Sequence, residues 1–294
     1  MKKFFYSKKI APYVFICPFV ITVMLFWIAP ICNGVLLSFQ DVLKDEWVGF
    51  HNYSRLLSDK IFLKALFNST KYMLGTLVLL IPFPMLFATL LNSKLMKGSG
   101  FFKSVYFIPA LTSVVVAGTI FRLMFGESAT SLANEVIGMF GLEPIKWLKG
   151  AGTSYFALLL IACWRWTGVN ILYFLSGLQS IPTELYEAAS IDGATKWQQF
   201  KKISVPLVKP TTVYVLTISI YAGLSMFLES NMLFKGNNSP RNIGLTIVGY
   251  LYRQGVEKRA LGYACAVGLI LLVVIMVVNV IQLKATGTFD EEGE

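Results

Sequence analysis

Long apolar stretches separated by polar segments dominate this 294-residue chain. A helix needs about 20 residues to cross the ~30 Å hydrocarbon core of a bilayer, and six stretches meet that length. They lie near residues 11–39, 72–91, 104–125, 154–178, 208–233 and 261–283. Because lipid offers no hydrogen-bond partner, each stretch must satisfy its own backbone groups and is expected to be helical. The pattern predicts an all-α integral membrane protein with six transmembrane helices, forming a single membrane domain over residues 1–294.

Local breaks and short helices are expected between and within these spans. Pro82, Pro84 and Pro109 fall inside apolar stretches, so the second and third helices should be bent and packed inside the bundle. The polar segment 40–71 mixes charged and apolar residues, which suits a helix on the outer membrane surface or a loop with a short helix. A further short helix is expected near Leu132–Phe140.

Composition supports a membrane protein and narrows its chemistry. The chain is 55% hydrophobic and 14% charged, with a mean hydropathy of +0.64, whereas soluble domains are about a quarter charged. None of the four cysteines forms a C-x-x-C pair and His51 is the only histidine, so no disulfide framework or metal site is indicated. The net charge of +10 is spread over segments flanking the spans rather than along one face, so we expect contact with membrane lipid and not with nucleic acid.

The orientation in the membrane follows from two polar segments. Residues 1–10 and 93–103 carry lysines and no acids, and such segments remain in the cytoplasm. The total of lysine and arginine is the same on both predicted sides, so the orientation depends on these two segments. No small-x-small cleavage site follows the first apolar stretch, so we expect it to be a retained helix. With six spans, both termini are predicted to be cytoplasmic.

The polar segment 182–206 has the chemistry of two short helices joined by a turn. Pro182 ends the preceding helix, Thr183 is expected to cap the next, and Glu184 and Glu187 are expected in its first turn, where acids are favoured. Glycine at position 193 predicts the helix end, because glycine adopts the left-handed conformation without a Cβ clash.

The second helix of this segment has its own start and end signals. Thr195 and Gln198 have the spacing of a capping box. Trp197, Phe200 and Ile203 form one apolar stripe, and Pro206 is expected to end the helix. The segment is longer than helix packing requires, which suggests that it binds a partner. The alternative is an amphipathic hairpin that only anchors the bundle.

The spacing of Glu187-Ala-Ala, Gly193 and Ile203-x-Val205-Pro206 resembles the cytoplasmic coupling loop of binding-protein-dependent ABC importer permeases. The resemblance covers roughly residues 10–283 and is greatest to the maltose- and glycerol-phosphate-type first permeases of the carbohydrate family. Further matching segments are Gly49-Phe50 to Tyr53, Phe107-Ile108-Pro109-Ala110, Ile145-Lys146-Trp147-Leu148, Gly177-Leu178-Gln179-Ser180-Ile181-Pro182 and Asn238-Ser239-Pro240. The family usually has Leu in place of Val205 and Gly-Gly-Pro in place of Asn238-Ser239-Pro240.

The resemblance implies a cytoplasmic helix-turn-helix coupling loop between helices 4 and 5 that docks into a groove of an ATPase dimer. The residues implied in coupling are Glu187, Ala188, Ala189, Asp192, Gly193, Ile203 and Pro206. The other implied partners are a second permease, most simply in a heterodimer although a homodimer stays open, and an extracytoplasmic sugar-binding protein. The chain has no G-x-x-x-x-G-K-[ST] motif, so ATP and Mg²⁺ are expected on the ATPase and no cofactor is expected on this chain.

Polar and aromatic side chains within the fourth and fifth spans are candidates for the substrate pathway. They are Arg165, Trp166, Asn170, Tyr173, Tyr221, Ser225 and Glu229. The last three have four-residue spacing and are expected on one helix face. Charged residues within spans are costly and suggest function, while hydrogen bonding between helices is the alternative explanation.

These features favour a permease subunit of an ATP-driven importer that moves a sugar, in particular an oligosaccharide, by alternating access in a bacterial plasma membrane. A permease for glycerol phosphate or a polyol is the first alternative. A membrane enzyme is disfavoured by the lack of paired acids or a metal constellation within the spans. A secondary transporter is disfavoured because Arg165 is the one strong candidate for a charge near mid-membrane.

Overall fold

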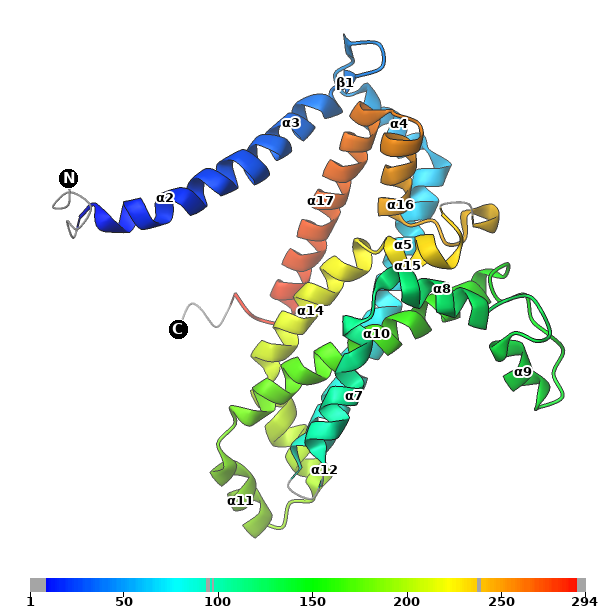
Figure 1. Ribbon diagram of the computed structural model, residues 1–294. Helices are drawn as coiled ribbons and strands as arrows, with labels where there is room; N and C mark the ends of the chain where they lie inside the picture. The colour runs from blue at the N-terminus through cyan, green and yellow to red at the C-terminus, as the bar shows by residue number, and fades with distance from the viewer. Residues whose placement is uncertain (1–8, 94–95, 97, 237–238, 290–294) are drawn as a thin grey trace. The chain divides into compact units, whose positions relative to one another are not determined.

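The computed structural model describes residues 9–93, 96, 98–236 and 239–289 (Figure 1). The remaining residues lie outside this description. They include Asn238 and most of the lysines of segments 1–10 and 93–103, on which the predicted orientation depends. The described chain is helical apart from loops and one short hairpin, so the all-α prediction is confirmed. Its contacts divide it into two compact units, Met1–Asp59 with Leu251–Ile270, and Lys60–Tyr250 with Leu271–Glu294.

The first unit begins with an uninterrupted apolar helix. It consists of α2 (Ala11–Val23), the π-helical turn η1 (Met24–Ile28) and α3 (Ala29–Ser38), which together form one candidate span of 28 residues. In an 18-residue apolar stretch of this helix, no residue is buried against the rest of the described chain. This helix matches the predicted span 11–39.

A hairpin and a short helix close the end of α3. Strands β1 (Gln40–Asp41) and β2 (Glu46–Trp47) pair antiparallel, and α4 (His51–Ser58) follows. Because the last carbonyls of a helix have no intrahelical donor, the buried side chain of Asn52 is well placed: its Nδ2 donates to the Ser38 carbonyl at 2.9 Å and to the Gln40 carbonyl at 3.1 Å. The unit also contains the π turn η4 (Arg253–Glu257).

The second unit begins with a longer helix than the sequence predicted. Helix α5 (Lys60–Leu80) continues through Ile81 into α6 (Pro82–Asn92), and the two form one candidate span of 33 residues. The predicted span started at residue 72 because apolar character begins there. The helix starts earlier because Phe62, Ala65 and Ser69 recur at helical spacing and are buried.

The third predicted span is sharply bent. Helix α7 (Ser99–Leu111) and α8 (Val114–Met124) meet at an angle of 93°. The bend was expected from Pro109, but the break lies three residues later, where Thr112 and Ser113 have extended ψ angles of 137° and 131°. Proline disturbs the turn that precedes it, so Pro109 alone does not place the break at Thr112 and Ser113.

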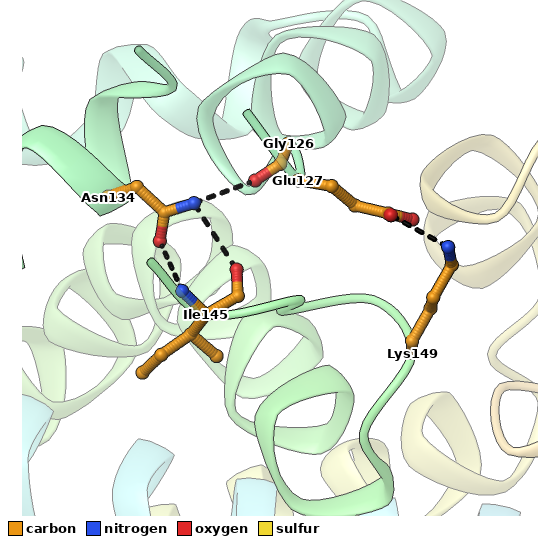
Figure 2. Close-up of polar contacts among 5 residues, drawn as sticks. All are labelled: Gly126, Glu127, Asn134, Ile145 and Lys149. Carbon is orange, nitrogen blue, oxygen red and sulfur yellow. Dashed lines mark hydrogen bonds and ion pairs between the residues drawn. The ribbon is translucent and has the colours of Figure 1, made fainter. Parts of the chain in front are cut away.

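A folded loop joins α8 to the next span. It contains α9 (Leu132–Gly138), close to the predicted Leu132–Phe140, and is organised by one buried asparagine (Figure 2). The Asn134 side chain accepts from the backbone N–H of Ile145 at 3.0 Å and donates to the carbonyls of Ile145 and Gly126 at 3.2 and 3.3 Å. Lys149 and Glu127 form a salt bridge of 2.7 Å beside it.

The fourth span is the long helix α10 (Ala151–Gln179), as predicted for residues 154–178. The fifth is interrupted, so the prediction of one continuous helix over 208–233 is wrong. Helix α14 (Lys209–Leu224) ends before Ser225, Phe227 has a non-helical φ of −140°, and α15 (Leu228–Leu233) follows.

A compact return leads to the last span. It consists of the 3₁₀ turn η3 (Pro240–Asn242) and α16 (Ile247–Tyr252), after which α17 (Leu261–Ala285) matches the predicted 261–283. Four helices of the described chain are long and apolar enough to cross a membrane, or up to six if each bent pair counts as one span.

Two apolar clusters form the core of the second unit. One gathers Tyr72, Phe121, Ile161 and Leu233 with neighbouring side chains. The other gathers residues from α6, α10 and the start of α14, including Leu91, Phe174, Leu178, Ile181 and Val208. The second cluster lies at the end of the unit from which residues 182–206 extend, and it therefore supports that segment.

Candidate functional site

The first helix of the 182–206 segment is α11 (Thr183–Ile191), and none of its residues is buried. Its start differs from the prediction. Pro182 and not Thr183 occupies the N-cap position, and no side chain caps the helix. Glu184 lies in the first turn as expected, whereas Glu187 is one turn further along and exposed. Most of the helix surface is therefore free of contacts within the described chain.

The turn after α11 has the predicted geometry. Gly193 has a φ of +77°, and the Ala194 N–H donates to the Ala189 carbonyl at 2.8 Å. A left-handed residue at this position closes the helix end by satisfying its last carbonyls. The glycine prediction is confirmed.

The second helix starts with the predicted capping box. The Thr195 N–H donates to Gln198 Oε1 at 2.7 Å, and the Gln198 N–H donates to Thr195 Oγ1 at 3.3 Å. Helix α12 (Lys196–Gln199) continues as the π turn η2 (Phe200–Ser204) and α13 (Val205–Leu207).

Pro206 does not end this second helix, contrary to the prediction. The helix continues to Leu207, and the 67° bend into α14 falls at Val208. Inside a continuing helix, a proline removes one backbone hydrogen bond. The π turn just before it is the local adjustment that accommodates the lost hydrogen bond.

A buried glutamine joins the two arms of the segment, which sequence reasoning missed. Gln199 is 3% exposed, and its Nε2 donates to Ser190 Oγ at 2.7 Å and to the Tyr186 carbonyl at 3.3 Å. The hydroxyls of Tyr186 and Ser204 lie 2.9 Å apart. The sequence sign of this contact was a polar residue, Gln199, between the apolar positions Trp197 and Phe200 of the second helix. These bonds fix the angle between α11 and α12.

The two arms enclose a hollow of about 360 Å³ beside the turn. Among the predicted coupling residues, Ala189, Asp192, Gly193 and Ile203 line it, while Glu187, Ala188 and Pro206 are exposed outside it. Ile203 also packs against the second apolar cluster. At the tip of α11, Ile191 is 88% exposed. A rigid turn with an exposed apolar tip is suited to insertion into a groove of another protein.

Arg165 holds the bent third span. Its Nη1 donates to the Thr112 carbonyl at 2.6 Å, at the break between α7 and α8. Its guanidinium carbon lies 5.2 Å from the centre of the Trp166 ring, and its buried Nε has no hydrogen-bond partner among the described residues. The half-buried charge is therefore partly satisfied by a carbonyl that the bend exposes.

Asn170 has a similar contact with the second span. Its Nδ2 donates to the Leu80 carbonyl at 2.8 Å, and the side chain is buried. In a regular helix that carbonyl would accept from residue 84, which is Pro84 and has no N–H. Asn170 thus replaces the missing donor, which is the helix-to-helix role that the sequence left open.

The other predicted pathway residues do not form one cluster. Tyr173 packs edge-on against Tyr214 at 5.3 Å. Tyr221 is 59% exposed near the end of α14, Ser225 is the C-cap of that helix, and Glu229 belongs to α15. The expected single face of Tyr221, Ser225 and Glu229 is therefore wrong, because the helix breaks between the second and third of them.

The described residues offer no metal-binding cluster: in 9–93, 96, 98–236 and 239–289, no three His, Cys, Asp or Glu side chains lie together in an arrangement that could hold an ion.

Comparison with known proteins identifies the family of this chain. The model of the binding-protein-dependent transport system inner membrane component family matches residues 12–284. The chain belongs to this family. The predicted family is confirmed, and because these proteins are transport permeases, the membrane-enzyme alternative is removed.

Two named relatives are similar to this chain over nearly its whole length. The chain is 53% identical to the arabinooligosaccharides transport system permease protein AraP of Bacillus subtilis (strain 168), over 98% of this chain and 92% of the relative. The protein of the same name from Halalkalibacterium halodurans is 47% identical, over 97% and 90% of the two chains.

A solved structure shares the fold of this permease. It is the bacterial alginate ABC transporter in complex with an alginate pentasaccharide-bound periplasmic protein, whose matching chain is 22% identical with a TM-score of 0.84. The match covers 97% of this chain and 98% of the other.

Proposed function

We propose that this permease is a transmembrane subunit of an ATP-driven importer that carries arabino-oligosaccharides into the cytoplasm by alternating access. The observation that carries the proposal is the 53% and 47% identity, over nearly the whole chain, to two permeases of arabino-oligosaccharide transport systems.

Uptake tests this proposal directly. A bacterial strain that lacks the chain should lose uptake of labelled arabinotriose and regain it when the chain is restored, while uptake of labelled glycerol 3-phosphate stays unchanged. Depleting ATP while the membrane potential is held should abolish uptake. Unchanged arabinotriose uptake in the deletion strain would refute the substrate, and uptake that survives ATP depletion would refute the ATP-driven mechanism.

The segment 182–206 is, in this proposal, the contact with a cytoplasmic ATPase dimer. The exposed α11, the hollow beside Gly193 and the exposed Ile191 support it, since they form a surface that little else in the described chain covers. The Gln199 hydrogen bonds make the two arms move as one body, so a displacement of α11 is passed to α14 through the bend at Val208. ATP and Mg²⁺ are held by the ATPase and not by this chain.

The remaining subunits follow from the same proposal. A second permease, most simply a different chain, completes the pathway between the two bundles, and an extracytoplasmic sugar-binding protein delivers the substrate. The segment 182–206 then faces the cytoplasm of a bacterial plasma membrane, with both termini on the same side. Purification of the tagged chain in mild detergent should recover an ATPase and a second permease. A chain that purifies alone at low salt would contradict this assembly.

A further inference from the structure

A cavity of about 210 Å³ lies in the second unit, far along the helices from the 182–206 segment. Its inner wall consists of the buried side chains of Tyr72, Leu158 and Met226. Lys64, Lys71 and Tyr155 line it nearer the surface. Neither the predicted coupling residues nor the predicted pathway residues take part in it.

Two lysines give the rim of this cavity a positive charge. They lie two turns apart on α5, which places them on the same face of the helix. Lys64 Nζ donates to the Arg241 carbonyl. Lys71 Nζ lies 4.2 Å from the centre of the Tyr155 ring, and the Tyr155 hydroxyl donates to the Lys71 carbonyl at 2.7 Å.

An anion fits these groups. In the part of the chain that the structure describes, neither lysine forms a salt bridge, and no carboxylate lines the cavity. Each ammonium has three donors, of which a carbonyl or an aromatic ring occupies only part. Two lysine ammonium groups that form no salt bridge among the described residues favour a ligand with a phosphate or a carboxylate.

The depth of the cavity in the membrane indicates which kind of anion is suited to it. The inner ends of α6 and α10 share an apolar cluster with the 182–206 segment. Counting about 20 residues back from Asn92 and from Gln179 places the far edge of the hydrocarbon core near Met73 and Leu160. Lys71 therefore lies at that edge and Tyr155 a few residues beyond it, at the level of the lipid headgroups, where tyrosine is enriched. Lys64 lies two helical turns further out than Lys71.

The surface below the lysines is apolar and uncovered. Leu74 and Val78 are 53% and 68% exposed, and they follow Lys71 along one side of α5 at intervals of three and four residues. An acyl chain that descends from a phosphate at the lysines would lie along these side chains.

We propose that this cavity and the adjoining face of α5 bind an anionic phospholipid of the outer leaflet. The phosphate contacts the ammonium groups of Lys64 and Lys71, and one acyl chain packs along Leu74 and Val78. The outer-leaflet placement rests on the proposed cytoplasmic side of the 182–206 segment. The lipid contact itself involves neither the sugar nor the ATPase, so lipid retention and sugar uptake can fail separately.

The test uses the full-length chain with its copurifying subunits in detergent, titrated with dioleoyl phosphatidylglycerol or dioleoyl phosphatidylcholine and analysed by native mass spectrometry. We expect preferential retention of phosphatidylglycerol. Each lysine near a membrane surface contributes about 1 kcal/mol, so Lys64→Gln with Lys71→Gln should lower phosphatidylglycerol affinity by about tenfold to thirtyfold. Lys64→Arg with Lys71→Arg should retain binding, which separates loss of charge from misfolding.

The matched control is Lys146→Gln with Lys149→Gln, which removes the same charge from the loop outside the cavity and should leave lipid retention unchanged. Equal retention by the wild type and the Lys64 and Lys71 glutamine variant would overturn the proposal. Displacement of the lipid by millimolar inorganic phosphate would reassign the cavity to a soluble anion. Absence of bound phosphatidylglycerol in the intact assembly would assign this face to the second permease instead.

Discussion

Substitutions at Gly193 test the backbone geometry of the turn after α11. A Cβ built at this position meets nothing within 4 Å, so a substitution there creates no clash. The φ of +77° is nevertheless disfavoured for residues with a Cβ. Replacing Gly193 by Asn, Ala and Val therefore varies backbone strain without a clash inside this chain.

The size of the effect follows from the cost of the left-handed conformation. That cost is about 1–2 kcal/mol for an ordinary residue, is smaller for Asn, and is greater for a β-branched residue such as Val. At about 1.4 kcal/mol per factor of ten, Gly193→Ala should weaken association with the ATPase by about fivefold to thirtyfold. The loss of ATPase association should be smallest for Asn, larger for Ala and greatest for Val.

The assay is ATP hydrolysis by the purified assembly, stimulated by arabinotriose and its binding protein, together with the amount of ATPase that copurifies. Gly138→Ala in α9 is the matched control, because a Cβ there also meets nothing and the backbone has no positive φ. It should leave both measurements unchanged. If Gly193→Val retains full association and stimulation, the turn is not required for coupling and the reasoning from its geometry is wrong.

Two further outcomes are expected. Ile191→Asp should lower ATPase association by at least about thirtyfold, because a buried apolar anchor of an interface typically contributes 2 kcal/mol or more. Leu43→Asp, on a different exposed loop, should leave association unchanged. Equal association of the two variants in pull-downs would contradict docking at Ile191. Asn170→Leu should lower the free energy of unfolding by about 1–3 kcal/mol, because the buried Leu80 carbonyl loses its donor. Adding Pro84→Ala should recover part of that loss by supplying a backbone N–H, and thermal unfolding that shows no recovery would refute the proposed replacement of the missing donor.

Features that depend on neighbouring residues were readable from the sequence. The apolar stretches predicted the first, fourth and sixth spans to within a few residues, because a bilayer-spanning helix is defined by its own length and composition. The turn at Gly193 and the capping box at Thr195 and Gln198 were also predicted, since their hydrogen bonds join residues a few positions apart.

The predictions that failed concern helix ends within long apolar or polar runs. The break after Leu224 follows Gly223, but an isolated glycine inside an apolar run does not by itself specify a break, and α5 starts at Lys60 in a segment that is not apolar overall. Hydropathy does not register either feature. In both places, packing against other helices of the second unit determines where the helix begins or ends.

Only the tertiary structure decided what the polar residues of the spans contact. Arg165 meets Thr112 and Asn170 meets Leu80 across 53 and 90 residues of chain, and Gln199 joins the two arms of the 182–206 segment. The sequence determined that these groups must be satisfied once buried, because an unpaired polar group in an apolar surrounding is costly. It could not determine the partner, because the Thr112 and Leu80 carbonyls are distant in the sequence and approach these side chains only when the helices pack together.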